Sequence, residues 1–185
     1  MAQLRIFMPA ELFEPAAYQH FEGTHDIVAL ASGPDLYSFS APVSWNAEVT
    51  NVGDALLVTG SVEGTATTSC SRCLEDVELA LLGEIEGYFL IGDETTAPED
   101  MDDDEFDVLP EDRMIDFDPL IRAALLLELP LVPLCVDDCK GLCPRCGANL
   151  NDGPCDCPSE SDDEAFDANP FAALKNLVFD EEQKG

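Results

Sequence analysis

Cysteine is the residue type in this 185-residue chain whose spacing most clearly suggests chemistry. The eight cysteines form four close pairs, numbered here in chain order: Cys70/Cys73, Cys135/Cys139, Cys143/Cys146 and Cys155/Cys157. One close pair can direct two sulfur atoms at a single metal ion, and two pairs complete the tetrahedral set of soft ligands that Zn²⁺ prefers. The spacing therefore predicts two zinc ions, with all eight cysteines as ligands.

The four pairs can be combined into two sites in three ways. Closing a short loop costs less entropy than closing a long one, which favours joining the third pair with the fourth and leaves the first pair for the second. An alternative joins the contiguous second and third pairs and leaves the first to meet the fourth. Iron–sulfur clusters also take four thiolates, so the sequence alone leaves open both the partition and the choice between zinc and iron–sulfur.

The residues around the third and fourth pairs favour a compact zinc ribbon. Gly147 follows Cys146 and permits the positive φ angle with which a chain turns around a metal. The loop from 148 to 154 is dense in the turn formers Asn, Asp, Gly and Pro.

Three basic residues stand in or next to the cysteine pairs, although the chain has only 8 Lys and Arg in total. They are Arg72, Lys140 and Arg145. A Zn²⁺ ion with four thiolates is anionic and benefits from nearby cations. These residues are also the candidate partner-binding residues, with ordinary turn solubility as the competing explanation.

The chain is strongly acidic, with 39 Asp and Glu and a formal net charge of −31. Such a surface repels a phosphate backbone and attracts basic proteins. Direct RNA binding is therefore expected to be weak or indirect. The acid is densest between residues 92 and 114, which predicts a flexible acidic loop.

The start of the chain lacks the apolar stretch of a secretory signal, which predicts a cytoplasmic protein whose cysteines bind metal rather than form disulfides. The most apolar run, residues 123–134, is interrupted by Glu128, Pro130 and Pro133. It is too short to span a bilayer, so no membrane association is expected.

Alternating apolar and polar residues predict a β-hairpin over 43–49 and 56–64, and a third strand over 77–91. The first cysteine pair then lies in a strand-to-strand turn. Ile115–Phe117 reads as a short strand, and Asp118 as the N-cap of a helix that starts at Pro119 and ends at Glu128. His20 and His25 have no ligand spacing and are expected on the surface.

The predicted fold class is α+β: an antiparallel β-rich domain with a few helices, a small C-terminal zinc ribbon and an acidic flexible loop. The domain covers residues 1–140, and its zinc site is closed by the first and second cysteine pairs. The ribbon covers 141–157. An acidic linker and a C-terminal helix, at about 170–179, occupy 158–185.

No nucleophile motif or phosphate-binding glycine-rich loop occurs in the sequence. A dithiol redox enzyme would need a reactive cysteine at a helix N-terminus, and no βαβ pattern surrounds these pairs. We therefore expect neither an enzyme nor a small-molecule substrate.

Three segments resemble one known family. They run from Cys70 to Glu75, from Leu129 to Cys135 and from Asp138 to Asn151, and the stretch 169–177 resembles the same family's ending. The family is YceD, the large ribosomal RNA subunit accumulation proteins of bacteria and chloroplasts. Some members have His at the positions of Cys135 and Cys139 and lack the second cluster, which supports joining this pair to the first.

The resemblance implies a role in 23S rRNA accumulation and large-subunit assembly, no enzymatic activity, and a link to ribosomal protein L32. The expected function is a non-catalytic zinc-binding factor that acts on the large-subunit precursor, through a basic ribosomal protein such as L32. The alternatives are a zinc/thiol redox switch and a zinc-ribbon nucleic-acid-binding module.

Overall fold

The computed structural model of the chain describes residues 3–92 and 106–157, and these fall into two compact units that divide between Cys139 and Lys140. The predicted linker and C-terminal helix at 158–185 lie outside the described residues, as do residues 93–105 of the predicted acidic loop. In its described residues, the first unit is a mostly antiparallel β structure with one α-helix. None of the described helices is long and apolar enough to cross a bilayer.

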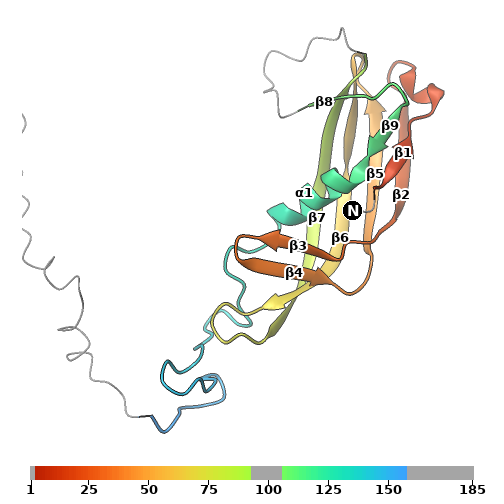
Figure 1. Cartoon of the computed structure of the whole chain (residues 1–185). Coiled ribbons are helices and arrows are strands. Elements are labelled where there is room, and N and C mark those ends of the chain that lie inside the picture. Colours follow the sequence, from red (N-terminus) through yellow and green to blue (C-terminus); the bar gives the residue numbers. More distant parts are fainter. Residues whose placement is uncertain (1–2, 93–105, 158–185) are drawn as a thin grey trace, which may run out of the picture. The chain divides into compact units, whose positions relative to one another are not determined.

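Figure 1 shows how the elements of the first unit are arranged. In chain order they are β1 (Arg5–Phe7), the 3₁₀ helix η1 (Ala10–Phe13), β2 (Tyr18–His25), β3 (Ala29–Ser32), β4 (Asp35–Phe39), β5 (Val43–Asn51), β6 (Ala55–Ser69), β7 (Asp76–Leu90), β8 (Asp107–Val108), β9 (Met114–Asp116) and α1 (Phe117–Leu127).

The large sheet is built around β6, which confirms the predicted hairpin and third strand. β7 pairs with β6 along its whole length, from Ala55 opposite Leu90 to Ser69 opposite Asp76. β6 therefore has one edge left, and that edge carries β5 and then the end of β4. β2 continues the sheet beyond β5, and β3 continues it beyond β4.

One face of this sheet is covered and the other is open to solvent. Along β5, residues 43, 45, 47 and 49 are buried, whereas 44, 46 and 48 are exposed. Helix α1 lies across the covered face, where it packs on β6 and β7 (Figure 1). It buries Phe117, Ile121, Ala124 and Leu125. The alternation that predicted the strands thus reflects a sheet with only one buried face.

Gly83 of β7 makes the close approach of α1 possible. A Cβ atom at this position would lie 2.5 Å from the carbonyl oxygen of Ala124. Only glycine leaves room for the helix backbone at such a distance. At the start of α1, the ring of Trp45 packs on that of Phe117, with 5.2 Å between centroids.

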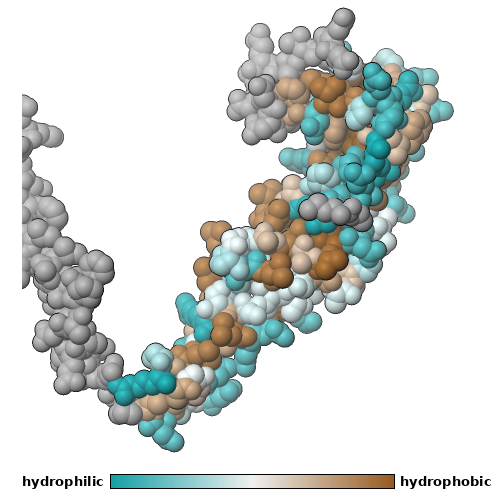
Figure 2. Space-filling view, viewed as in Figure 1, coloured by the Kyte–Doolittle hydropathy of each residue, from teal (hydrophilic) through white to brown (hydrophobic). Residues whose placement is uncertain are grey.

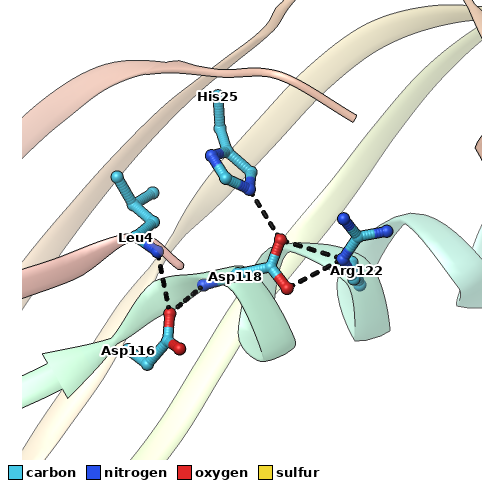
Figure 3. Close-up of polar contacts among 5 residues, drawn as sticks. All are labelled: Leu4, His25, Asp116, Asp118 and Arg122. Atoms are coloured by element: carbon cyan, nitrogen blue, oxygen red, sulfur yellow. Dashed lines mark hydrogen bonds and ion pairs between the residues drawn. The ribbon is translucent and has the colours of Figure 1, made fainter. Parts of the chain in front are cut away.

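The predicted start of α1 is wrong by two residues. The N-cap is Asp116, whose carboxylate accepts a hydrogen bond from the Asp118 N–H at 3.1 Å (Figure 3). Pro119 consequently stands at the third helical position rather than the first. Proline is tolerated there because the N–H groups of the first turn have no partner within the helix.

The prediction that His25 lies on the surface is also wrong, since its exposed fraction is only 6%. Its Nε2 lies 2.6 Å from the carboxylate of Asp118, which also accepts two 2.8 Å hydrogen bonds from Arg122 Nε (Figure 3). This group joins the end of β2 to the first turns of α1. His20 is exposed, as predicted.

The described end of the predicted acidic loop also differs from the prediction. β8 pairs in parallel with the end of β7, and the Leu109 N–H donates to the Leu90 carbonyl at 2.9 Å. Leu109 is buried in the core. An apolar residue among acids thus attaches this part of the segment to the sheet, where we expected a flexible loop.

Candidate metal centres

The first candidate centre joins two parts of the first unit that are distant in sequence. Cys70 and Cys73 lie in the turn between β6 and β7, as predicted, and Cys135 and Cys139 lie in the segment that follows α1. The Ser71 N–H donates to the Pro133 carbonyl at 2.8 Å and so fixes this segment against the turn.

The sulfur atoms of this first centre are spaced as metal ligands. All four lie within 4.8 Å of one another. The Cys70 and Cys139 sulfurs are 3.8 Å apart, and those of Cys73 and Cys135 are 3.5 Å apart. A zinc ion with Zn–S bonds of about 2.3 Å places its sulfurs about 3.8 Å apart, whereas a disulfide needs about 2.05 Å. The donor set therefore fits a four-thiolate zinc site.

The backbone of the Cys70–Cys73 turn is held by two hydrogen bonds. The Leu74 N–H donates to the Cys70 carbonyl at 2.9 Å, and the Cys70 N–H donates to the Glu75 carbonyl at 2.7 Å. Leu74 has a φ of +62°. A leucine does not predict a positive φ, but the position would, because Leu74 follows Cys73 as Gly147 follows Cys146.

The second candidate centre belongs to the second unit and brings together Cys143, Cys146, Cys155 and Cys157, again within 4.8 Å. The two groups of sulfurs thus follow the partition that short loop closure favours. Gly147 adopts the positive φ predicted for it, at +72°. Its N–H donates to the Cys143 carbonyl at 2.9 Å, and the Cys143 N–H donates to the Ala148 carbonyl at 2.8 Å.

The rest of the described second unit is a loop framework. A single bridge joins Leu142 to Asn149, and the side chain of Asn151 accepts a 2.8 Å hydrogen bond from the Lys140 N–H. A zinc ribbon contains paired strands, whereas these described residues contain one isolated bridge. The zinc ribbon therefore stays a prediction.

Each sulfur group contains cysteines with opposite tendencies to ionise. The pKa of Cys143 is lowered to about 6 by the N–H groups of Cys146 and Arg145. Burial opposes ionisation of Cys70, but nearby N–H groups outweigh it and lower its pKa to about 6. The pKa of Cys157 is raised to about 12, chiefly by the neighbouring Cys146 sulfur.

The same pattern holds for Cys73. The N–H of Glu75 favours its thiolate, but burial and the neighbouring sulfurs raise its pKa to about 12. Neighbouring thiolates repel each other, so a full set of four needs a cation to offset their charge. Such a set suits Zn²⁺ chemically as well as geometrically.

Of the three basic residues marked as partner contacts, Arg72 has a role within the first centre. Its guanidinium donates to the Cys139 carbonyl at 2.8 Å, and its N–H lies 3.5 Å from the Cys70 sulfur. Lys140 and Arg145 are exposed residues of the second unit. Contact of all three with a partner stays a prediction.

Comparison with known proteins gives relatives among bacteria and plants. An uncharacterized protein of Mycobacterium tuberculosis is 36% identical over 106 residues, which cover 57% of this chain and 50% of that protein. The chloroplastic large ribosomal RNA subunit accumulation protein YCED homolog 1 of Arabidopsis thaliana is 30% identical over 154 residues, covering 70% of this chain and 48% of the homolog. The chain spans about half the length of these curated relatives.

A homolog of the same name from Zea mays is 30% identical over 135 residues, covering 60% of this chain and 46% of the homolog. No solved structure matches the chain. The family model described as large ribosomal RNA subunit accumulation protein YceD matches residues 58–178, a range that contains all eight cysteines. The chain therefore belongs to the YceD family, as its cysteine segments predicted.

Proposed function

We propose that this chain is a non-catalytic, zinc-binding cytoplasmic factor that promotes 23S rRNA accumulation and large ribosomal subunit assembly by acting on a basic ribosomal protein. The observation that carries this proposal is the family match, together with the names of the plant relatives. The matched range includes both sulfur groups, which links the proposed function to the candidate metal centres.

The role of bound zinc in this proposal is structural. Each ion would cross-link one group of four cysteines and replace their mutual repulsion with attraction. In the first unit this cross-link would add to the contacts that Ser71 and Arg72 make across the same junction. The β6–β7 turn and the segment after α1 would then behave as one rigid surface.

Four protein sulfurs per centre support the non-catalytic part of the proposal, because catalytic zinc sites keep one position open for water or substrate. The most buried acid–base group among the described residues, Asp118 with His25, is already paired with Arg122. It lies between β2 and α1, where it serves the fold.

Net charge supports a protein partner over free RNA. At −31 the chain repels phosphates and attracts basic surfaces. Most ribosomal proteins must neutralise rRNA and are basic for that reason. Ribosomal protein L32 is the first candidate from the family resemblance.

The proposal is tested by depleting the protein in its own organism and measuring the ratio of 23S to 16S rRNA. We expect the ratio to fall, to recover with the wild-type chain, and to stay low with a Cys73→Ser/Cys143→Ser double variant. Ser44→Ala, an exposed substitution in β5, is the matched control and should restore the ratio. An unchanged ratio after full depletion contradicts the proposal.

A further inference from the structure

The outer edge of β7 has no strand partner over most of its length. One edge of β7 is fully used by β6. On the other edge, β8 pairs only with Phe89 and Leu90, so among the described residues no strand covers Asp76–Tyr88. Proteins usually protect such an edge with charged side chains, especially lysine, or with proline or a bulge, and the charged residues of β7 are all acidic. The sequence of β7 contains neither lysine nor proline.

A groove of about 660 Å³ opens beside this edge. All five consecutive residues of Leu82–Glu86 line it, together with Thr59–Ser61 of β6, so the groove extends from the outer edge of β7 over the paired strands. Opposite them stand Leu120 and Leu127 of α1, which lie on one side of the helix.

The apolar part of this groove is exposed. Leu127 is 84% exposed and Leu82 is 65% exposed, although both are large aliphatic residues. Figure 2 shows apolar residues gathered at the surface near the C-terminal end of α1. Leu120 is partly buried against the core and lies close to Gly87 of β7, whereas Leu127, one step further along the same side of the helix, is left exposed.

The border of the groove is acidic. Glu84, Glu86 and Glu128 line it, and no Lys or Arg is among its lining residues. Of the six exposed positions of β7, four are acidic: Asp76, Glu78, Glu84 and Glu86. Two copies of β7 placed edge to edge would bring these carboxylates together, which is unfavourable. The charges therefore disfavour a second copy of this chain and favour a basic strand.

We propose that the outer edge of β7, with the groove under α1, binds an extended basic segment of a partner protein as an added strand. Main-chain hydrogen bonds to β7 provide the attachment. Apolar side chains on the α1 side of the added strand contact Leu120 and Leu127, and Lys or Arg side chains on its other side pair with Glu84 and Glu86, which share a face of β7 with Leu82. The choice of a basic protein rests on the proposed function, and the edge and groove supply the mode of binding.

The test uses the full zinc-loaded chain and a fluorescent ten-residue peptide of alternating lysine and valine, with binding followed by anisotropy. We expect Glu84→Lys/Glu86→Lys to weaken binding about tenfold, because the steering and pairing charges are reversed. Glu22→Lys/Glu48→Lys makes the same charge change on β2 and β5 and should weaken binding less than about threefold, since screening limits distant charges.

Two further comparisons test the groove and the edge. Leu127→Ser should weaken binding, whereas Leu131→Ser, at a residue that is 91% exposed and does not line the groove, should not. Peptides N-methylated on alternate amides distinguish strand addition from other modes, because only one edge of an added strand faces β7. Methylation of one set should abolish binding, and methylation of the other set should leave it intact.

Any of three results would overturn the proposal. The two charge reversals could weaken binding equally, the two methylated peptides could bind equally, or the chain could associate with itself through β7. Two results together would also overturn it. The peptide would fail to bind, and a single-stranded RNA oligonucleotide would bind the Glu84→Lys/Glu86→Lys variant no more tightly than the wild type. This assay is separate from the rRNA measurement. If depletion lowers 23S rRNA but the peptide does not bind, the proposed function stands and this binding surface is wrong. If the peptide binds but depletion leaves 23S rRNA unchanged, only the proposed function is wrong.

Discussion

Leu74 and Gly147 occupy the same position in the two cysteine turns. Each follows the second cysteine of its pair, each has a positive φ (+62° and +72°), and each donates its N–H to the carbonyl of the first cysteine at 2.9 Å. The N–H of that first cysteine returns to the carbonyl of the next residue, Glu75 or Ala148. The two turns therefore share one backbone design, with glycine in one and leucine in the other.

This shared design predicts opposite effects of exchanging the residue types. Gly147→Ala forces a side chain into the left-handed region and should destabilise the second site by about 1 kcal/mol. Leu74→Gly relieves that strain, and Leu74 is too exposed to lose much packing. We expect this variant to be as stable as the wild type or up to about 1 kcal/mol more stable. Zinc affinity measured by competition with a chelator checks both, and a loss in both variants would contradict the shared design.

Metal analysis of the purified chain should give two zinc ions, and substitution should separate the two centres. The first centre joins the β6–β7 turn to the segment after α1, so Cys73→Ser should lower the main unfolding transition. Cys143→Ser alters the second unit and should leave that transition unchanged. Circular dichroism during thermal unfolding distinguishes these outcomes. Zinc release with disulfide formation under mild peroxide would instead favour a redox switch.

The Asp118 carboxyl gives the first unit a defined dependence on pH. Burial alone would raise its pKa, but hydrogen bonds from Arg122 and His25 outweigh burial and hold the pKa below its ordinary value. A depressed pKa contributes stability that is complete above the unfolded value of about 3.9 and is lost as the pH falls through the folded value.

We therefore expect Asp118→Asn to cost about 1–3 kcal/mol near neutral pH, because Arg122 and His25 lose a charged partner. The difference from the wild type should shrink steadily once the pH falls below about 4. Urea unfolding at several pH values measures it. Asp26→Asn, at an exposed position, is the control. A difference that stays constant down to about pH 2 would show that Asp118 does not act through its charge.

Gly83 is expected to be the least tolerant glycine of β7. In Gly83→Ala the new methyl carbon would lie 2.5 Å from the Ala124 carbonyl oxygen, a backbone atom that cannot rotate away. Displacing α1 should cost about 1–3 kcal/mol. Ala80→Ser, at an exposed position in the same strand, should be nearly neutral. Thermal unfolding of the two variants provides the comparison, and equal melting temperatures would contradict this packing role.

The sequence predicted the parts of the fold whose signals are local. β5, β6 and β7 alternate because one face of the sheet is solvated, and the cysteine turns follow from short spacings. β2 was not predicted, because seven of its eight residues are exposed or half-buried and no alternation marks it. His25 was wrongly predicted to lie on the surface because its partner Asp118 is 93 residues away in the sequence. A local sequence pattern cannot predict such a contact.

β1, near the start of the sequence, pairs with β9 of the same unit, and Arg5 lies opposite Asp116. The Leu4 N–H also donates to the Asp116 carboxylate, across 112 residues of sequence. Contacts of such high sequence separation slow folding, and during synthesis they cannot form until the later partner has left the ribosome. The two cysteines that complete the first centre, at 135 and 139, emerge soon after β9. Sheet closure and the capture of metal therefore fall at the same late stage of translation, so a nascent chain that stalls before this point lacks both constraints.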